Sequence, residues 1–140
     1  MTTHPLAPRA LVVVGAGGAI GALARYGLGR AFPVAPGTFP TTTFAINVAG
    51  AFVLAFLLET LVRRGSPDHW LRLLIGVGVL GAFTTFSTMA TELALLWRDG
   101  DRALAGAYAG ASLVAGALAV LAGLALAGFR RGPVPDEDES

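Results

Sequence analysis

The 140-residue sequence contains no cysteine and no lysine, and only 14% of its residues are charged. Without cysteine, the chain has no disulfide, no thiolate nucleophile and no cysteine-based metal site. Soluble domains carry about 25% charged residues, so the low charge predicts a surface that faces something other than water. A net charge of +1 also lacks the basic excess that nucleic-acid binding requires, and we expect no nucleic-acid partner.

Apolar residues are abundant instead, at 54% of the sequence with a mean hydropathy of +0.68. They gather in stretches long enough to cross the hydrocarbon layer, which takes about 20 residues of helix. The expected membrane helices are residues 10–32, 41–62, 70–97 and 103–129. The links between them are short and rich in Pro, Gly, Arg and Asp, so they leave no room for a soluble domain.

We therefore expect one membrane domain, residues 10–129, between two polar tails. Residues 1–9 form a short N-terminal tail. Residues 130–140 end in a run of acidic side chains, which is typical of a solvated, disordered segment.

Arginines in the links and tails indicate the orientation of the chain. On the N-terminal side of the membrane lie Arg9, Arg63, Arg64, Arg130 and Arg131. On the opposite side lie Arg30, Arg98 and Arg102. The excess favours a cytoplasmic N-terminus, but it is small, and a small excess is what insertion in both orientations requires.

A glycine-rich run near the N-terminus looks like a phosphate-binding loop. Residues 11–21 read LVVVGAGGAIG, a variant of the dinucleotide-binding fingerprint. That fingerprint needs a βαβ unit and an acidic residue about 20 positions later, whereas the first acidic residue here is Glu59. We interpret Gly17 and Gly21, with Gly18 and Ala22, as small residues that let two membrane helices approach closely.

Polar side chains inside the expected spans are costly in lipid, so each is a candidate functional residue. Arg25 lies in the first span, where it can face a water-filled vestibule and attract anions, or extend to the headgroups. Thr43 and Asn47 are four residues apart and share one face of the second helix. The Asn47 amide can donate to an anion, or it can only join two helices.

The middle of the third span, residues 81–89, reads GAFTTFSTM and carries four hydroxyl groups. This composition suggests a helix that breaks in mid-membrane, where freed backbone carbonyls can coordinate a cation. The alternative is a continuous helix whose hydroxyls bond to carbonyls of the preceding turn. The residues by themselves leave both structures open.

Two further hydroxyls, on Tyr108 and Ser112, lie four residues apart in the fourth span. Glu92, near the end of the third span, is either interfacial or buried against Thr43. No carboxylate stands in the middle of the first, second or fourth span, where a cation or proton pathway would normally need one. The polar groups are hydroxyls, an amide and an arginine, a set that suits a small anion.

Three segments resemble the Fluc/CrcB family of fluoride channels: residues 17–26 (GGAIGALARY), 43–50 (TFAINVAG) and 81–88 (GAFTTFST). The resemblance implies an all-α membrane protein of four transmembrane helices, the third broken, in a bacterial-type inner (plasma) membrane. It implies an antiparallel, dual-topology homodimer with two pores and a structural Na⁺ at the dimer interface. The implied function is passive, selective export of cytoplasmic fluoride, with no enzymatic step.

The resemblance also implies roles for individual residues. The Na⁺ is expected on main-chain carbonyls of Gly81 and Thr84 from both subunits. Fluoride is expected to pass Asn47 and the ring edge of Phe86, with Arg25 facing the vestibule. The candidates for a track of hydroxyls or its flanks are Thr43, Ser87, Thr88, Tyr108 and Ser112.

One departure from the family pattern concerns the pore itself. Met89 stands where the family usually has a second pore phenylalanine. A phenylalanine edge carries partial positive charge that can meet an anion, whereas a thioether is polarisable but has no such edge. Gly116 stands where another hydroxyl would extend the track. We therefore expect a working but slower pore.

Two other classes of membrane protein remain as alternatives. A small dual-topology multidrug or cation exporter also has four helices, but proton coupling needs a carboxylate in its first helix, where this sequence has none. A non-transporting subunit would use the same polar residues only to join helices. Substitution of Asn47 or Phe86 would then impair assembly without changing ion flux.

Overall fold

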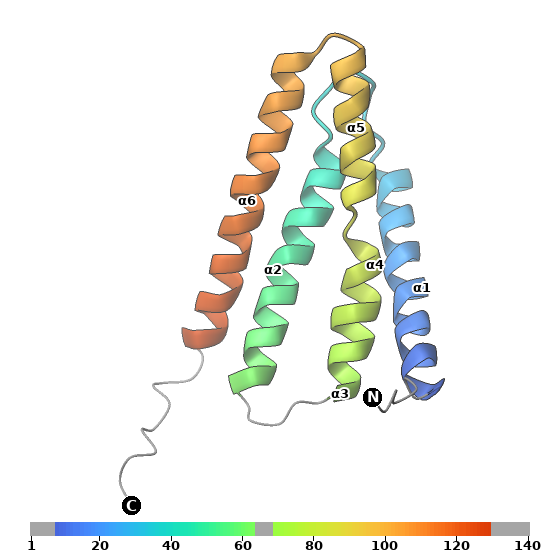
Figure 1. The fold of residues 1–140 in the computed structure, drawn as a ribbon, viewed down its shortest axis with the longest axis vertical. Helices are drawn as coiled ribbons and strands as arrows, with labels where there is room; N and C mark the ends of the chain where they lie inside the picture. The colour runs from blue at the N-terminus through green and yellow to red at the C-terminus, as the bar shows by residue number, and fades with distance from the viewer. Residues whose placement is uncertain (1–7, 64–68, 130–140) are drawn as a thin grey trace, which may run out of the picture.

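The computed structural model describes residues 8–63 and 69–129, and all regular structure within them is helical. The elements are α1 (Pro8–Ala31), α2 (Thr41–Arg63), α3 (His69–Leu71), the π-helix η1 (Arg72–Leu80), α4 (Gly81–Phe83), α5 (Phe86–Arg98) and α6 (Arg102–Phe129). Figure 1 shows long helices side by side, with α4 and α5 stacked end to end between α2 and α1.

The two polar tails fall largely beyond this description. The expected acidic tail, 130–140, and residues 1–7 of the expected N-terminal tail lie outside the described residues. Pro8 and Arg9 belong to α1, so that helix begins before the expected boundary. Proline is tolerated in a first turn, where its missing N–H would have had no intrahelical partner.

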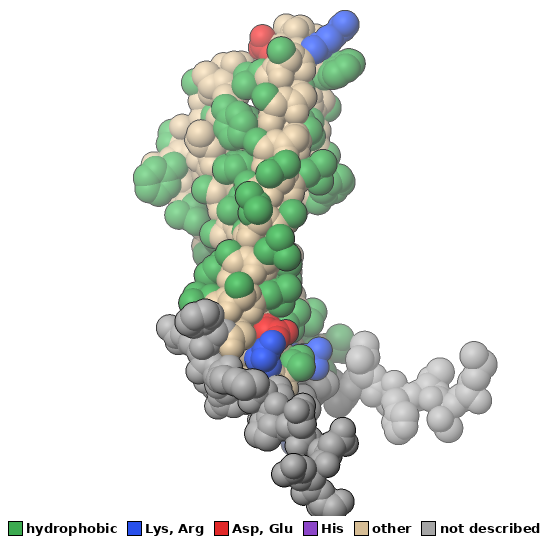
Figure 2. Space-filling view, turned by 90° about the vertical axis from the view of Figure 1, so that its left-hand side faces the viewer, with side chains coloured by type: hydrophobic (Ala, Val, Ile, Leu, Met, Phe, Trp, Pro, Cys, Tyr) green, Lys and Arg blue, Asp and Glu red, His purple; other side chains and the backbone are tan. Residues whose placement is uncertain are grey.

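Four segments are long and apolar enough to span a membrane, as the hydropathy of the sequence predicts: Pro8–Ala31, Thr41–Arg63, Arg72–Arg98 and Arg102–Gly128. Figure 2 shows the α6 side of the molecule, which is apolar along its length and carries charged side chains at its two ends. This distribution matches a hydrocarbon layer between two headgroup regions. The prediction of a four-span, multi-pass membrane protein is confirmed.

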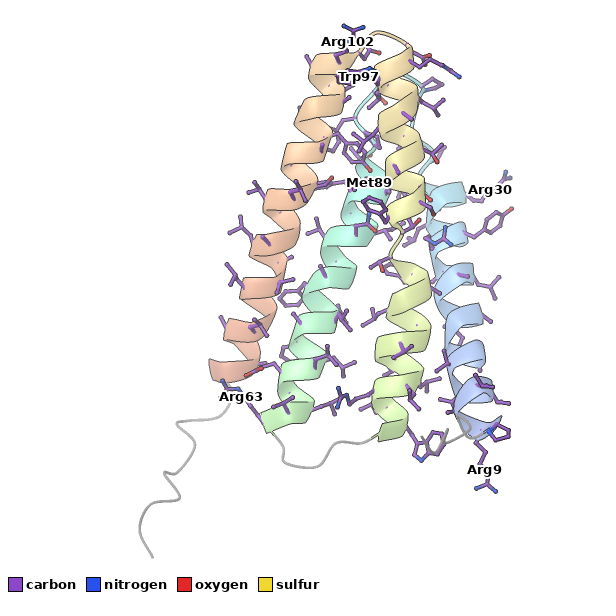
Figure 3. The ribbon with its side chains drawn as sticks, in the orientation of Figure 1. Arg9, Arg30, Arg63, Met89, Trp97 and Arg102 are labelled. Carbon is purple, nitrogen blue, oxygen red and sulfur yellow. The ribbon has the colours of Figure 1, made fainter. Side chains whose placement is uncertain are left out.

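Several side chains labelled in Figure 3 lie near the ends of the bundle: Arg9, Arg63, Trp97 and Arg102. Arg9 and Arg63 are found at the end where the first helix begins, and Arg102 at the opposite end. The Arg102 guanidinium lies over the ring of Trp97, with its carbon 5.4 Å from the ring centroid. Such pairs of arginine and an amphipathic ring are typical of the membrane interface.

The seam between α1 and η1 depends on the glycines of the N-terminal run. Gly17 and Gly21 are buried, and a side chain at either would strike a backbone carbonyl of η1, that of Leu74 or of Val79. The two backbones therefore approach as closely as glycine allows. The interpretation of these glycines as a packing face is confirmed.

The other main helix pair is α2 with α6. On α6, Ala119, Gly123 and Ala127 are buried and four residues apart, so they form one stripe along the helix. A Cβ at Gly123 would lie 2.6 Å from the carbonyl oxygen of Phe52. Small residues thus bring α6 against α2, as they bring α1 against η1.

The third span is interrupted rather than continuous. After η1 and α4, Thr84 and Thr85 have extended backbones with ψ values of 151° and 112°, and α5 starts at Phe86. We call these two residues the break. The hydroxyl-rich segment therefore adopts the broken form and not the continuous helix. The nine-residue π-helix before it has no counterpart in the sequence-based expectations.

Candidate functional site at the break

The break is fixed locally by its own two threonines. The Thr85 hydroxyl accepts a hydrogen bond from Thr88 N at 3.1 Å and so caps the start of α5. Threonine is a favoured N-cap because its oxygen replaces a missing intrahelical acceptor. Thr84 turns back instead, and its backbone N and Oγ1 donate to the carbonyl of Leu80 at 3.1 and 2.9 Å.

Asn47 of α2 holds the peptide groups of Thr85 from across the bundle. Its Nδ2 donates to Thr85 O at 3.0 Å, and Thr85 N donates to its Oδ1 at 2.8 Å. The side-chain amide therefore replaces the backbone partner that an extended residue inside a membrane protein must find. An asparagine amide has a second N–H donor, which this pair of bonds does not use.

Arg25 of α1 also contacts the break. Its Nε donates to Ala82 O at 3.1 Å. That carbonyl belongs to the last turn before the break, where backbone carbonyls have no intrahelical N–H donor. A guanidinium there also offsets the negative end of the helix dipole. The contact directs the Arg25 guanidinium towards the break, and its role at a vestibule stays a prediction.

A cavity of about 300 Å³ lies beside the break, between α1, α2 and α5. Its polar lining includes Arg25 and Arg30 of α1 with Thr85, Thr88 and Glu92 of the third span. Two guanidinium groups against one carboxylate give the cavity an excess of positive charge, which attracts anions. The sequence indicates Arg30 only as a charge near one membrane surface, and its place in this lining follows from the packing of α1.

Glu92 links three spans. Its Oε1 accepts from the Thr43 hydroxyl at 2.7 Å and its Oε2 from the Tyr108 hydroxyl at 2.8 Å. Tyr108 is completely buried, and the ring of Phe39 meets it edge-on with 5.2 Å between centroids. Glu92 is therefore half-buried and in contact with Thr43, and not simply interfacial. The Tyr108 partnership was missed, because nothing in the sequence relates two residues on different helices.

Hydroxyl groups gather at the first turn of α5. Thr85 Oγ1 donates to Thr88 Oγ1 at 3.0 Å, and Ser87 Oγ lies 3.2 Å from Thr85 Oγ1. Ser87 is exposed and Thr88 half-buried in the single chain. The candidate hydroxyls of Ser87 and Thr88 thus form one connected cluster with that of Thr85, next to the Asn47 amide.

Phe86 and Met89 do not point the same way. Phe86 is 77% exposed, whereas Met89 is half-buried and packs on the cluster that contains Tyr108. Figure 3 shows Met89 near the start of α5. Three residues rotate an α-helix by about 300°, so their side chains diverge by about 60°. Met89 therefore packs towards α6, while the Phe86 ring stays at the surface of the single chain.

Ser112 of α6 carries a buried hydroxyl oxygen with no hydrogen-bond partner among the residues that the structure describes. Leaving such a group unsatisfied costs about 1–3 kcal/mol. Native proteins rarely tolerate this cost without a bound partner or a role. The hydroxyl is therefore an open hydrogen-bonding position one helical turn from Tyr108.

The hydrogen bonds around the break also decide which carbonyls stay free. In a continuous α-helix, Thr85 N would bond to Gly81 O, and Thr88 N to Thr84 O. Here Thr85 N donates to Asn47, and Thr88 N donates to Thr85 Oγ1. The carbonyls of Gly81 and Thr84 thereby lose their helical donors. These are the two groups that the family resemblance associates with a cation.

Comparison with known proteins places the chain in a family. The family described as CrcB-like protein, Camphor Resistance (CrcB), matches residues 12–124. The chain is 46% identical over 116 residues to "Fluoride-specific ion channel FluC 3" of Streptomyces avermitilis, covering 83% of this chain and 57% of that protein. It is 45% identical over 121 residues to "Fluoride-specific ion channel FluC" of a Chelativorans species, and 44% identical over 120 residues to a protein of the same name from Novosphingobium aromaticivorans.

The last two matches cover 84% of this chain and 94% of each relative. The chain therefore spans little more than half of the Streptomyces relative but nearly all of the other two. Family and relatives agree with one another and with the segments that gave the resemblance. The chain belongs to the CrcB/FluC family.

Proposed function

We propose that this protein is a fluoride-selective, passive anion channel that exports cytoplasmic fluoride. The observation that carries the proposal is the cavity beside the break, which is lined by hydroxyls and two arginines inside the membrane-spanning region. Next to it, the Asn47 amide is anchored by the peptide of Thr85 and retains a second N–H. The relatives' names supply the identity of the anion.

Fluoride is small and strongly hydrated, so a pore must replace its water with close donors and still release it. Hydroxyls, an amide N–H and aromatic edges are donors of moderate strength without full charge. We place Arg25 at the vestibule, Asn47 and Phe86 in the narrow part, and Met89 beside them. The hydroxyl track consists of Thr43, Ser87, Thr88, Tyr108 and Ser112. The unpaired Ser112 oxygen supports this assignment.

No energy source other than the ion gradient is required. Hydrogen fluoride crosses membranes as a neutral acid and dissociates in the more alkaline cytoplasm. The negative interior then favours anion exit by about 2.3 kcal/mol per charge per 100 mV. The protein performs no chemical step and is not an enzyme. An exporter coupled to protons would need a carboxylate in its first helix, and α1 has none.

We further propose that two chains form an antiparallel, dual-topology homodimer with two pores. Phe86 is exposed beside the exposed Ser87, and a polar side chain in mid-membrane is costly in lipid, which supports an additional surface that covers this part of α5. The small arginine excess on one side supports insertion in both orientations. Each subunit contributes one membrane domain, residues 10–129, between its two polar tails.

A structural Na⁺ at the dimer interface completes the proposal. Main-chain carbonyls suit a small alkali cation, as they do in selectivity filters. The carbonyls of Gly81 and Thr84 lose their helical donors at the break, and Gly81 is exposed in the single chain. Two subunits would supply both groups twice. The donor set therefore fits the cation that the family resemblance implies.

The test is anion efflux from liposomes that contain the purified protein, loaded with potassium fluoride or potassium chloride and read with ion-selective electrodes. We expect rapid fluoride efflux and negligible chloride efflux after a potassium ionophore is added. Asn47→Ala and Phe86→Ala should assemble normally and lose fluoride efflux. Equal silence for both anions, or equal rates, would refute the proposal. Normal flux in both variants would favour a structural role for these residues.

A further inference from the structure

We infer that Asn47 is also a positioning residue of the cation site, and that it couples this site to the anion path. The inference rests on the proposed function, because it concerns the proposed Na⁺ carbonyls and the proposed anion donor. Its basis is the pair of hydrogen bonds between the Asn47 amide and the peptide groups of Thr85.

The first step concerns the N–H of Thr85. A backbone N–H inside a membrane must have a partner, and in a regular helix that partner would be Gly81 O. At 2.8 Å, Asn47 Oδ1 takes this donor away. The second bond, from Asn47 Nδ2 to Thr85 O, holds the same residue extended, so the N–H cannot swing back. Asn47 therefore keeps the Gly81 carbonyl free.

The second step concerns the neighbouring carbonyls. Leu80 O receives both donors of Thr84, and Ala82 O receives Arg25 Nε. The carbonyls on either side of Gly81 are thus satisfied by protein groups, whereas no donor to that of Gly81 is found within residues 8–63 and 69–129. Asn47 and Arg25 reach the break from two different helices. Between them they select which carbonyl remains for a cation.

The third step links the two ions. In our proposal, the unused N–H of Asn47 donates to fluoride. An amide that donates to an anion becomes a stronger acceptor at its oxygen, because hydrogen bonds in a chain polarise one another. Fluoride on Asn47 therefore strengthens the Thr85 bond that frees Gly81 O. By linkage, bound Na⁺ must favour fluoride to the same extent.

The experiment measures Na⁺ affinity without measuring transport. The thermal unfolding midpoint of the purified protein in detergent is titrated with Na⁺ against N-methylglucamine at constant ionic strength. Asn47→Ala lets Thr85 N return to Gly81 O, so the Na⁺ concentration at half-effect should rise about five- to tenfold, the size of one net hydrogen bond. The matched control is Thr60→Ala on the same helix, which removes a side-chain hydrogen bond to Phe56 O more than three turns from Asn47 and should leave the Na⁺ concentration at half-effect unchanged.

An Asn47→Ala variant with the same Na⁺ concentration at half-effect as the wild type would overturn the inference. If Asn47→Ala does not fold, the wild type alone is decisive. Its Na⁺ concentration at half-effect should be lower in fluoride than in chloride. Equal Na⁺ concentrations at half-effect in the two anions reject the coupling. A wild type without any Na⁺ response rejects both the cation site and this inference. The liposome efflux assay still reports separately whether the protein is a fluoride channel.

Discussion

The hydrogen bonds to Glu92 provide a test of how a carboxylate is stabilised beside the proposed anion path. Its two oxygens accept from Thr43 at 2.7 Å and from Tyr108 at 2.8 Å. Hydrogen bonds to charged groups contribute about 1.5–3 kcal/mol each, so Thr43→Val or Tyr108→Phe alone should destabilise the protein by that amount. Both substitutions together leave the carboxylate without either donor. We expect the free energy of unfolding of the double variant to fall by more than the sum of the two single effects, by about 0.5–3 kcal/mol.

The assay is a double-mutant cycle on the free energy of unfolding in detergent, repeated for fluoride efflux from liposomes. In the Glu92→Gln background the charge is gone, and each substitution should cost only about 0.5–1.5 kcal/mol, as for neutral hydrogen bonds. Efflux should fall most in the double variant, because a bare carboxylate repels the anion. Additivity of the two substitutions within about 0.5 kcal/mol in the protein that retains Glu92 would refute the reasoning.

Three further outcomes are expected. Met89→Phe adds a positive ring edge and should raise the fluoride efflux rate, by up to about tenfold if the full edge interaction is expressed. Gly21→Val pushes a side chain into the carbonyl of Val79 and should reduce folded protein on size-exclusion chromatography, whereas Gly15→Val, which meets open space, should not. Ser112→Ala removes an unpaired buried hydroxyl, so thermal stability should stay equal or rise while fluoride efflux falls. Lower stability together with normal efflux would contradict that last pair of outcomes.

The helical architecture could be predicted because hydropathy and small residues act locally along the chain. The spans follow from apolar length, and the close approach of α1 to η1 follows from Gly17 and Gly21. The π-helix Arg72–Leu80 could not be predicted. Its residues are ordinary for an apolar α-helix, and the extra residue per turn depends on packing against neighbouring spans.

The polar residues of the site could be predicted from the sequence, but the hydrogen bonds between them could not. Asn47 and the hydroxyl-rich segment stand out as polar residues in lipid, yet nothing in the sequence states that the amide binds the peptide of Thr85. The same holds for Arg25 with Ala82 and for Glu92 with Tyr108. Such pairs form where separate helices meet, so they depend on the three-dimensional packing and not on spacing along the chain.

The dependence of the break on α1 and α2 has a consequence for biogenesis. Membrane helices first insert as separate segments and then associate. While the third span is alone in the bilayer, neither Asn47 nor Arg25 is present to receive its interrupted backbone. A continuous helix is then the only form that satisfies its peptide groups. We therefore expect the two-residue interruption to open only after the first two spans have docked, as a late event of maturation.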